Sequence, residues 1–93
     1  FNQFAVHGWF EGVNRGRAET RGDIHIHFLP VERGWVWQIP IDERRTSIGV
    51  VAEKRVFKRS GTDYAAWFDA LINAAPDIAV AMSDARRIND FKV

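Results

Sequence analysis

Alternating apolar and polar positions run through the first half of the chain and predict β-strands. The clearest example is segment 34–41, which reads Gly-Trp-Val-Trp-Gln-Ile-Pro-Ile. Four large apolar residues recur in it at period two: Trp35, Trp37, Ile39 and Ile41. A strand would place all four on one face of a sheet. Because Pro40 has no amide proton for a ladder, we expect this strand to lie at an edge, to bulge, or to end near Pro40.

Three other segments carry strand-like patterns: 4–13, 23–29 and 46–52. They are rich in aromatic and β-branched residues, and clusters of Gly or charged residues separate them. The connections on either side of segment 34–41 are short enough for hairpins, which favours antiparallel neighbours. We therefore predict a four-stranded antiparallel meander within residues 4–52.

Apolar residues recur at a spacing of three and four after residue 62, which predicts helices. Thr62 is a candidate N-cap for a first helix at about 63–75, and Pro76 favours the start of a second helix at about 77–83. The basic segment 53–59 is interpreted as a solvated transition, with contact to a phosphate as the alternative. Residues 86–93 are expected to be extended. The predicted fold class is α+β, a sheet followed by two helices.

Composition narrows the class of protein. The 93 residues contain no Cys and carry a formal net charge of +1, so neither a disulfide framework nor a strong electrostatic footprint for nucleic acid is indicated. No apolar run reaches the roughly 20 residues that a membrane-spanning helix needs. We expect residues 1–93 to form a single domain or a fragment of a longer chain, in a cytoplasmic protein that contacts neither nucleic acid nor membrane.

Three histidines raise the question of a metal site. His25 and His27 lie two apart on one predicted strand, where they would share a face, and His7 could be a third ligand. No carboxylate is spaced to complete such a site. The interpretation that we favour is that all three are ordinary strand residues, and we assign no metal and no catalytic residue.

The two Trp side chains of segment 34–41 allow two interpretations. Burial of an aromatic ring is worth a few kcal/mol, so core packing alone would account for both, and the residues by themselves favour it. The alternative is that the indoles line a pocket, since a flat apolar surface suits a planar ligand.

Segment 35–40 resembles the W-x-W-x-I-P motif of flavin-dependent halogenases of the tryptophan-halogenase type. The flanking segments 4–12, 22–26, 46–51 and 85–87 look like the same region of these enzymes and of the related FAD-dependent monooxygenases. The resemblance covers nearly the whole chain. It implies a p-hydroxybenzoate-hydroxylase-like fold, in which an antiparallel sheet covers the flavin and supplies part of the substrate pocket.

In this family the Trp motif lies near the flavin and is thought to hinder direct oxygenation of the substrate. Reduced flavin, oxygen and halide give hypohalous acid, which travels to a catalytic Lys. The resemblance assigns a place next to substrate and flavin to four residues: Trp35, Trp37, Ile39 and Pro40. It also implies FAD in the full-length parent, an FAD domain in the remainder of that chain, and a small-molecule substrate.

The sequence departs from the family pattern in two respects. It contains no dinucleotide-binding G-x-G-x-x-G, and none of Lys54, Lys58 and Lys92 matches the catalytic Lys. We therefore predict that this segment is the inactive substrate-side portion of an FAD-dependent oxidoreductase, halogenase- or monooxygenase-like. Its substrate is predicted to be an organic compound, with aromatic compounds as one option. The exposed sheet surfaces of the segment would favour homo-oligomers. The alternative is a stand-alone small-ligand binding module without catalysis.

Overall fold

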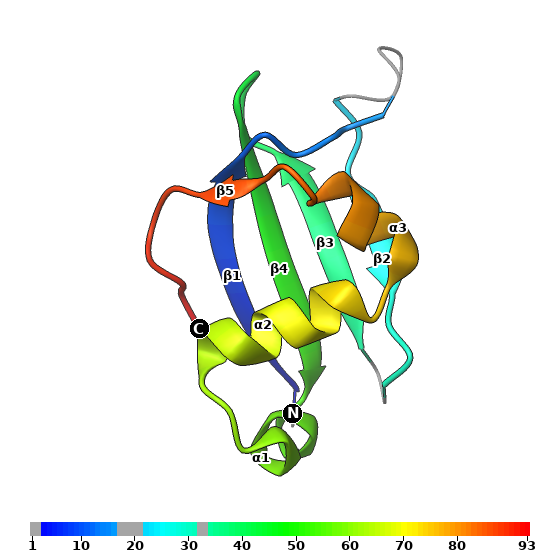
Figure 1. The fold of residues 1–93 in the computed structure, drawn as a ribbon, viewed down its shortest axis with the longest axis vertical. Helices are drawn as coiled ribbons and strands as arrows, with labels where there is room; N and C mark the ends of the chain where they lie inside the picture. Colours follow the sequence, from blue (N-terminus) through cyan, green and yellow to red (C-terminus); the bar gives the residue numbers. More distant parts are fainter. Residues whose placement is uncertain (1–2, 17–21, 32–33) are drawn as a thin grey trace.

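A five-stranded antiparallel sheet with helices packed on one face forms the body of the molecule (Figure 1). The computed structural model describes residues 3–16, 22–31 and 34–93. The strands are β1 (Gln3–Glu11), β2 (His25–Phe28), β3 (Trp35–Pro40), β4 (Arg45–Glu53) and β5 (Arg86–Arg87). The helices are α1 (Lys54–Ser60), α2 (Tyr64–Asn73) and α3 (Pro76–Ala81).

The strand order β2-β3-β4-β1-β5 corrects the predicted meander. Strands β2, β3 and β4 do follow one another as antiparallel neighbours, but β1 lies on the far side of β4, not beside β2. The register of this pair runs from Gln3 opposite Glu53 to Glu11 opposite Arg45. Residues 12–24 connect β1 to β2 and are long enough to pass the roughly three strand spacings between them. The prediction assumed that short connections join neighbouring strands, and this connection is too long for that assumption to apply.

The core lies between the sheet and α2. Strand side chains with no exposed surface (Val6, Val36, Ile48 and Val50) pack in one cluster with buried side chains of the helices. The Phe10 and Phe68 rings stack with centroids 5.5 Å apart. Figure 1 shows α2 lying across β1, β4 and β3, with α3 near β2. One face of the sheet therefore has a helical cover, and the strands point their alternate side chains to the opposite face.

Helix α2 begins one residue later than expected. Its N-cap is Asp63, not Thr62, and the Asp63 carboxylate accepts a hydrogen bond of 2.8 Å from the Ala66 backbone N–H. Both helices lie within or close to the ranges predicted for them. Among the described residues, no helix is long and apolar enough to cross a membrane.

The basic segment after β4 is a helix, which corrects its interpretation as a solvated transition. Helix α1 is held at the end of the sheet by Phe57, whose ring meets Phe4 edge-on at 5.0 Å. Gly61 ends the helix at a φ of 67°, a left-handed conformation that Gly adopts without strain. The Lys and Arg side chains of α1 are exposed, so only their solvation was predicted correctly.

The C-terminal segment covers the outer edge of β1. Strand β5 pairs with Phe10 and Glu11, and His7 and Lys92 exchange two backbone hydrogen bonds of 2.9 and 2.8 Å. Between them the Asn89 side chain accepts a hydrogen bond from the Trp9 backbone N–H at 2.8 Å. The extended conformation expected for residues 86–93 thus supplies hydrogen-bond partners for the backbone groups at this edge of the sheet.

Candidate functional site

The sheet surface turned away from the helices is largely apolar, and we call it the open face. It consists of Ala5, His7 and Trp9 on β1, Ile26 and Phe28 on β2, Trp35, Trp37 and Ile39 on β3, and Ser47, Gly49 and Val51 on β4. Several of its side chains have no cover, since Phe28 is 82% exposed and Ile26 is 47% exposed. Exposed apolar residues gathered in one place mark an interaction surface or a ligand site.

The Trp motif lies on this open face and not in the core. Trp35 and Trp37 are half-buried, whereas Val36 between them has no exposed surface and Gln38 is 4% exposed. The core interpretation that the residues alone favoured is therefore wrong about which face of β3 points to the core. Period two was identified correctly, but the face with the smaller side chains is the one beneath the helices.

Three of the four motif-strand residues predicted to share a face do so: Trp35, Trp37 and Ile39. Ile41 lies beyond the end of β3, in the hairpin, where its backbone N–H donates to the Arg45 carbonyl at 2.9 Å. Pro40 is the last residue of β3, so the expectation that the strand ends near it is confirmed.

Trp37 has well-defined neighbours on the open face. Its indole Nε1–H donates a 3.0 Å hydrogen bond to the Ser47 hydroxyl on the adjacent strand. The His7 ring lies 5.4 Å from the indole centroid, and the Trp35 ring lies 6.1 Å away at an angle of 52°. Four residues from three strands thus form one polar-edged aromatic cluster.

The histidines do not converge. His25 pairs with Gln38 and His27 pairs with Val36, so both lie on the helix side of the sheet, and the His27 Nε2 is 3.3 Å from the Gln38 Oε1. His7 lies on the open face. No group of three or more potential metal ligands occurs among the residues that the structure describes. His7 therefore lies on the opposite face from the other two histidines, and the interpretation of all three as ordinary strand residues stays a prediction.

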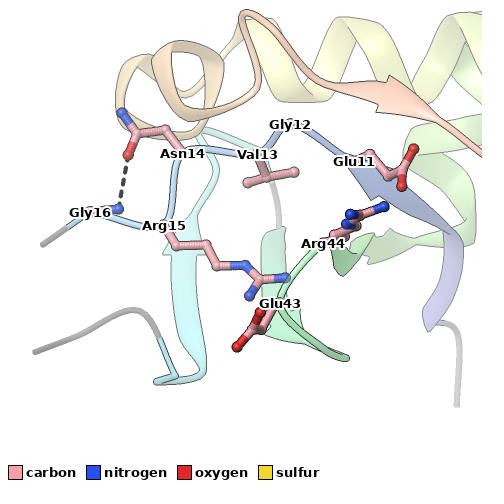
Figure 2. A pocket seen from close by; sticks show the side chains of 8 residues that line it. All are labelled: Glu11, Gly12, Val13, Asn14, Arg15, Gly16, Glu43 and Arg44. Atoms are coloured by element: carbon pink, nitrogen blue, oxygen red, sulfur yellow. Dashed lines mark hydrogen bonds between the residues drawn. The ribbon is translucent and has the colours of Figure 1, made fainter. Parts of the chain in front are cut away.

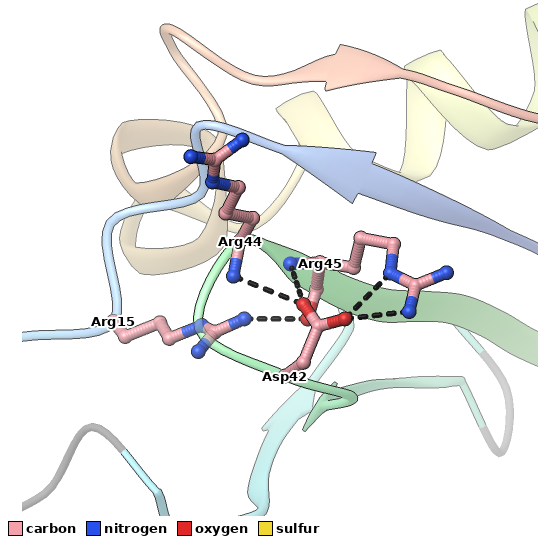
Figure 3. A network of polar contacts seen from close by, with 4 residues as sticks. All are labelled: Arg15, Asp42, Arg44 and Arg45. Atoms are coloured by element: carbon pink, nitrogen blue, oxygen red, sulfur yellow. Dashed lines mark hydrogen bonds and ion pairs between the residues drawn. The ribbon is translucent and has the colours of Figure 1, made fainter.

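The hairpin between β3 and β4 carries a polar network at one end of the open face (Figure 3). The Arg45 side chain donates to the Asp42 carboxylate at 2.7 Å, and the backbone N–H groups of Arg45 and Arg44 donate to it at 2.7 and 3.0 Å. These interactions, the Arg45 side chain first, lower the pKa of Asp42 to about 2. The same Arg45 guanidinium lies 5.0 Å from the centre of the Trp9 ring. Sequence reasoning missed this network, although Asp in a short connection is a turn signal, because its carboxylate can accept from a backbone N–H two residues further on.

A surface cavity of about 530 Å³ adjoins this hairpin (Figure 2). Its lining carries both charge signs: Glu11, Arg15, Glu43 and Arg44, together with residues 12–14 and 16. The Arg15 guanidinium is occupied by hydrogen bonds to the Thr46 hydroxyl and the Arg45 carbonyl. With balanced charges and no Trp-motif residue in its lining, this cavity is separate from the aromatic cluster.

Comparison with known proteins identifies relatives of this chain. No family model matches the chain. The 1H-pyrrole-2-carbonyl-(peptidyl-carrier protein) chlorinase of Pseudomonas fluorescens is 38% identical over 96 residues, which cover 99% of this chain and 21% of that protein. The tryptophan 2-halogenase of Chondromyces crocatus is 31% identical over 58 residues, or 62% of this chain and 11% of that protein.

Solved structures show the same fold. The myxobacterial chondrochloren halogenase superimposes with a TM-score of 0.86 at 23% identity, over 98% of this chain and 22% of that one. A flavin-dependent brominase superimposes with a TM-score of 0.82 at 25% identity, over 97% of this chain and 23% of that one. The chain thus spans about a fifth of the length of these relatives. These matches confirm the resemblance that the Trp motif suggested: the chain belongs to the flavin-dependent halogenase family and corresponds to one segment of its longer members.

Proposed function

We propose that this chain is the substrate-side portion of an FAD-dependent halogenase and that its open face forms one wall of the cavity that holds substrate and flavin. The observation that carries the proposal is the position of Trp35 and Trp37. Both indoles lie outside the core that α2 covers, in a chain with ample apolar residues to fill that core. A large aromatic pair left uncovered is explained by a ligand or a covering domain.

The open face suits the planar ring system of FAD and not its phosphates. Indole rings suit contact with a planar ring system, which favours stacked or edge-on aromatic neighbours. The sequence offers no Gly-rich loop for the phosphates, so we assign phosphate binding to the remainder of the parent chain. When bound, FAD supplies the redox chemistry that oxidises a halide. The residues of this chain would orient the organic ring and keep water away from it.

The choice of halogenation over hydroxylation or reduction rests on the relatives. The Pseudomonas fluorescens protein is a chlorinase of a pyrrole-carbonyl group on a carrier protein, and other relatives are halogenases or brominases. We accordingly propose an aromatic or similarly planar organic substrate. The p-hydroxybenzoate-hydroxylase-like domain and the cytoplasmic location expected from the sequence are part of the same proposal.

Two variants of the intact protein test the role of the open face. Trp37→Phe changes the aromatic cluster, and Trp67→Phe makes the same chemical change in the core, where Trp67 is 2% exposed. We expect Trp37→Phe to lower halogenated product per folded molecule at least about tenfold or to change the product, since small misplacements in a site cost up to about 100-fold. Trp67→Phe should lower stability and leave turnover per folded molecule unchanged.

The measurement is turnover with FAD, a reductant, oxygen and halide, with products identified by mass spectrometry. Equal turnover and identical products for both variants would remove the functional role of Trp37. A stand-alone binding module, the alternative expected from the sequence, would give no halide-dependent product with any version of the intact protein.

A further inference from the structure

Gly49 lies directly beneath the Trp37 indole. In the register of the sheet, Gly49 on β4 is opposite both Trp37 on β3 and His7 on β1, so these three residues form one row across the open face. A Cβ atom built on Gly49 would overlap three atoms of the six-membered indole ring, Cε2, Cζ2 and Cη2. The overlap with all three is similar, so the Cβ would point into the face of that ring and not against its edge.

Gly49 therefore leaves room for the Trp37 indole because it has no side chain. Gly49 is inside a regular strand, and its φ lies outside the left-handed region, so an Ala would be compatible with the backbone. The three nearest atoms to such a Cβ all belong to the indole. A glycine inside a strand often marks the close approach of another group to the backbone, and here the group is a ring lying on β4.

Ser47 fixes the same ring at its polar edge. The 3.0 Å hydrogen bond from the indole Nε1–H to the Ser47 Oγ sets the rotation of the indole about its long axis. Gly49 provides the surface on which the benzo ring rests, and Ser47 provides the acceptor for the pyrrole nitrogen. Both residues belong to β4, two positions apart on one face.

We infer that Gly49 and Ser47 are positioning residues that hold the Trp37 indole flat on β4, so that its outer ring face is presented to a planar aromatic ring of the ligand. A flat indole covers the strand and leaves its second π-face free for offset stacking. An upright indole would instead narrow the space above the sheet. The consequence for catalysis rests on the proposed function of the open face, whereas the position of the indole does not.

The position of the ring is tested by NMR on the intact protein labelled with ¹⁵N-tryptophan. Trp37→Phe identifies the Nε1–H signal of Trp37 by its loss. We expect Ser47→Ala to move this signal upfield and to make its exchange with water about tenfold faster, the factor that corresponds to a hydrogen bond of about 1.4 kcal/mol. Ser47→Thr keeps a hydroxyl and should restore both properties.

Gly49→Ala tests the other half of the arrangement through a double-mutant cycle. It should lower the melting temperature when Trp37 is present and should not lower it when Trp37 is replaced by Val, because the three atoms nearest to the new methyl group all belong to the indole. An indole signal that neither Ser47→Ala nor Gly49→Ala moves, or equal effects of Gly49→Ala in both backgrounds, would overturn the inference.

Turnover separates this inference from the proposed function. We expect Gly49→Ala to raise KM or alter the product ratio, and Ser47→Thr to retain more of the turnover than Ser47→Ala does. If Gly49→Ala displaces the indole signal and catalysis is unaffected, the positioning role stands and the proposed function of the open face fails. If catalysis changes and the indole signal does not, the positioning role fails.

Discussion

Replacement of Val36 by Ala should destabilise the protein without altering its chemistry. Val36 is the neighbour of Trp37 in the chain, but it has no exposed surface and packs in the core beneath α2. The change removes two carbon atoms at about 0.8 kcal/mol each, or about 1.6 kcal/mol. The space they leave, on the order of 50 Å³, adds about 1 kcal/mol at roughly 24 cal/mol per Å³. The expected loss in the free energy of unfolding is therefore about 2–3 kcal/mol.

Urea denaturation measures this loss. The midpoint should fall and the m-value should stay constant, since the mutation alters stability and not the surface exposed on unfolding. Ile26→Ala is the matched control, because Ile26 lies on the neighbouring strand, on the open face, and is 47% exposed. We expect it to cost less than about 1 kcal/mol. A Val36→Ala protein as stable as the control would refute the assignment of the helix side as the core of this sheet.

Three further outcomes follow from individual contacts. Asp42→Asn should remove stability that the parent has above about pH 4 and loses as the pH falls through the lowered pKa of about 2, so urea midpoints of the two proteins should differ at pH 7 and converge toward pH 2. Asp63→Ala should cost about 1 kcal/mol of unfolding free energy by removing the cap on the Ala66 N–H, whereas Asp63→Asn should recover most of it; equal midpoints for all three would contradict the cap. Phe28→Asp should reduce self-association of the 93-residue chain in light scattering, because Phe28 is the most exposed large apolar side chain of the open face; a monomer before the change would contradict this.

The alternation along β3 was readable from the sequence, but the direction of its two faces was not. Period two establishes that Trp35, Trp37 and Ile39 share a face. Transfer energies alone then favour burying the indoles, and the buried side chains are Val36 and Gln38 instead. What reverses the choice is the supply of other large apolar residues on α2, which fill the core and leave the Trp side free. That supply is a property of the whole fold.

The position of β1 and the existence of α1 depend on contacts distant in sequence. Nothing local to β1 specifies β4 as its partner, because the pairing joins residues 34 to 50 positions apart. Helix α1 has seven residues, too few to be stable alone, and its Phe57 needs Phe4 from the other end of the chain. The Trp motif, by contrast, was recognisable as a short local pattern, and it pointed to the family without the fold.

The central claim is that the open face meets the flavin in the intact protein, and ¹⁹F NMR with 5-fluorotryptophan tests it most directly. Signals of Trp35, Trp37 and Trp67 are assigned by replacing each with Phe, and FAD is then titrated into the intact apo-protein. Because an aromatic ring system changes the chemical shifts of nearby nuclei, we predict that the Trp35 and Trp37 signals move as FAD binds. The signal of Trp67, on the helix side, should stay in place. If FAD binds and shifts Trp67 while Trp35 and Trp37 remain unchanged, the open face does not line the flavin cavity and the account is contradicted.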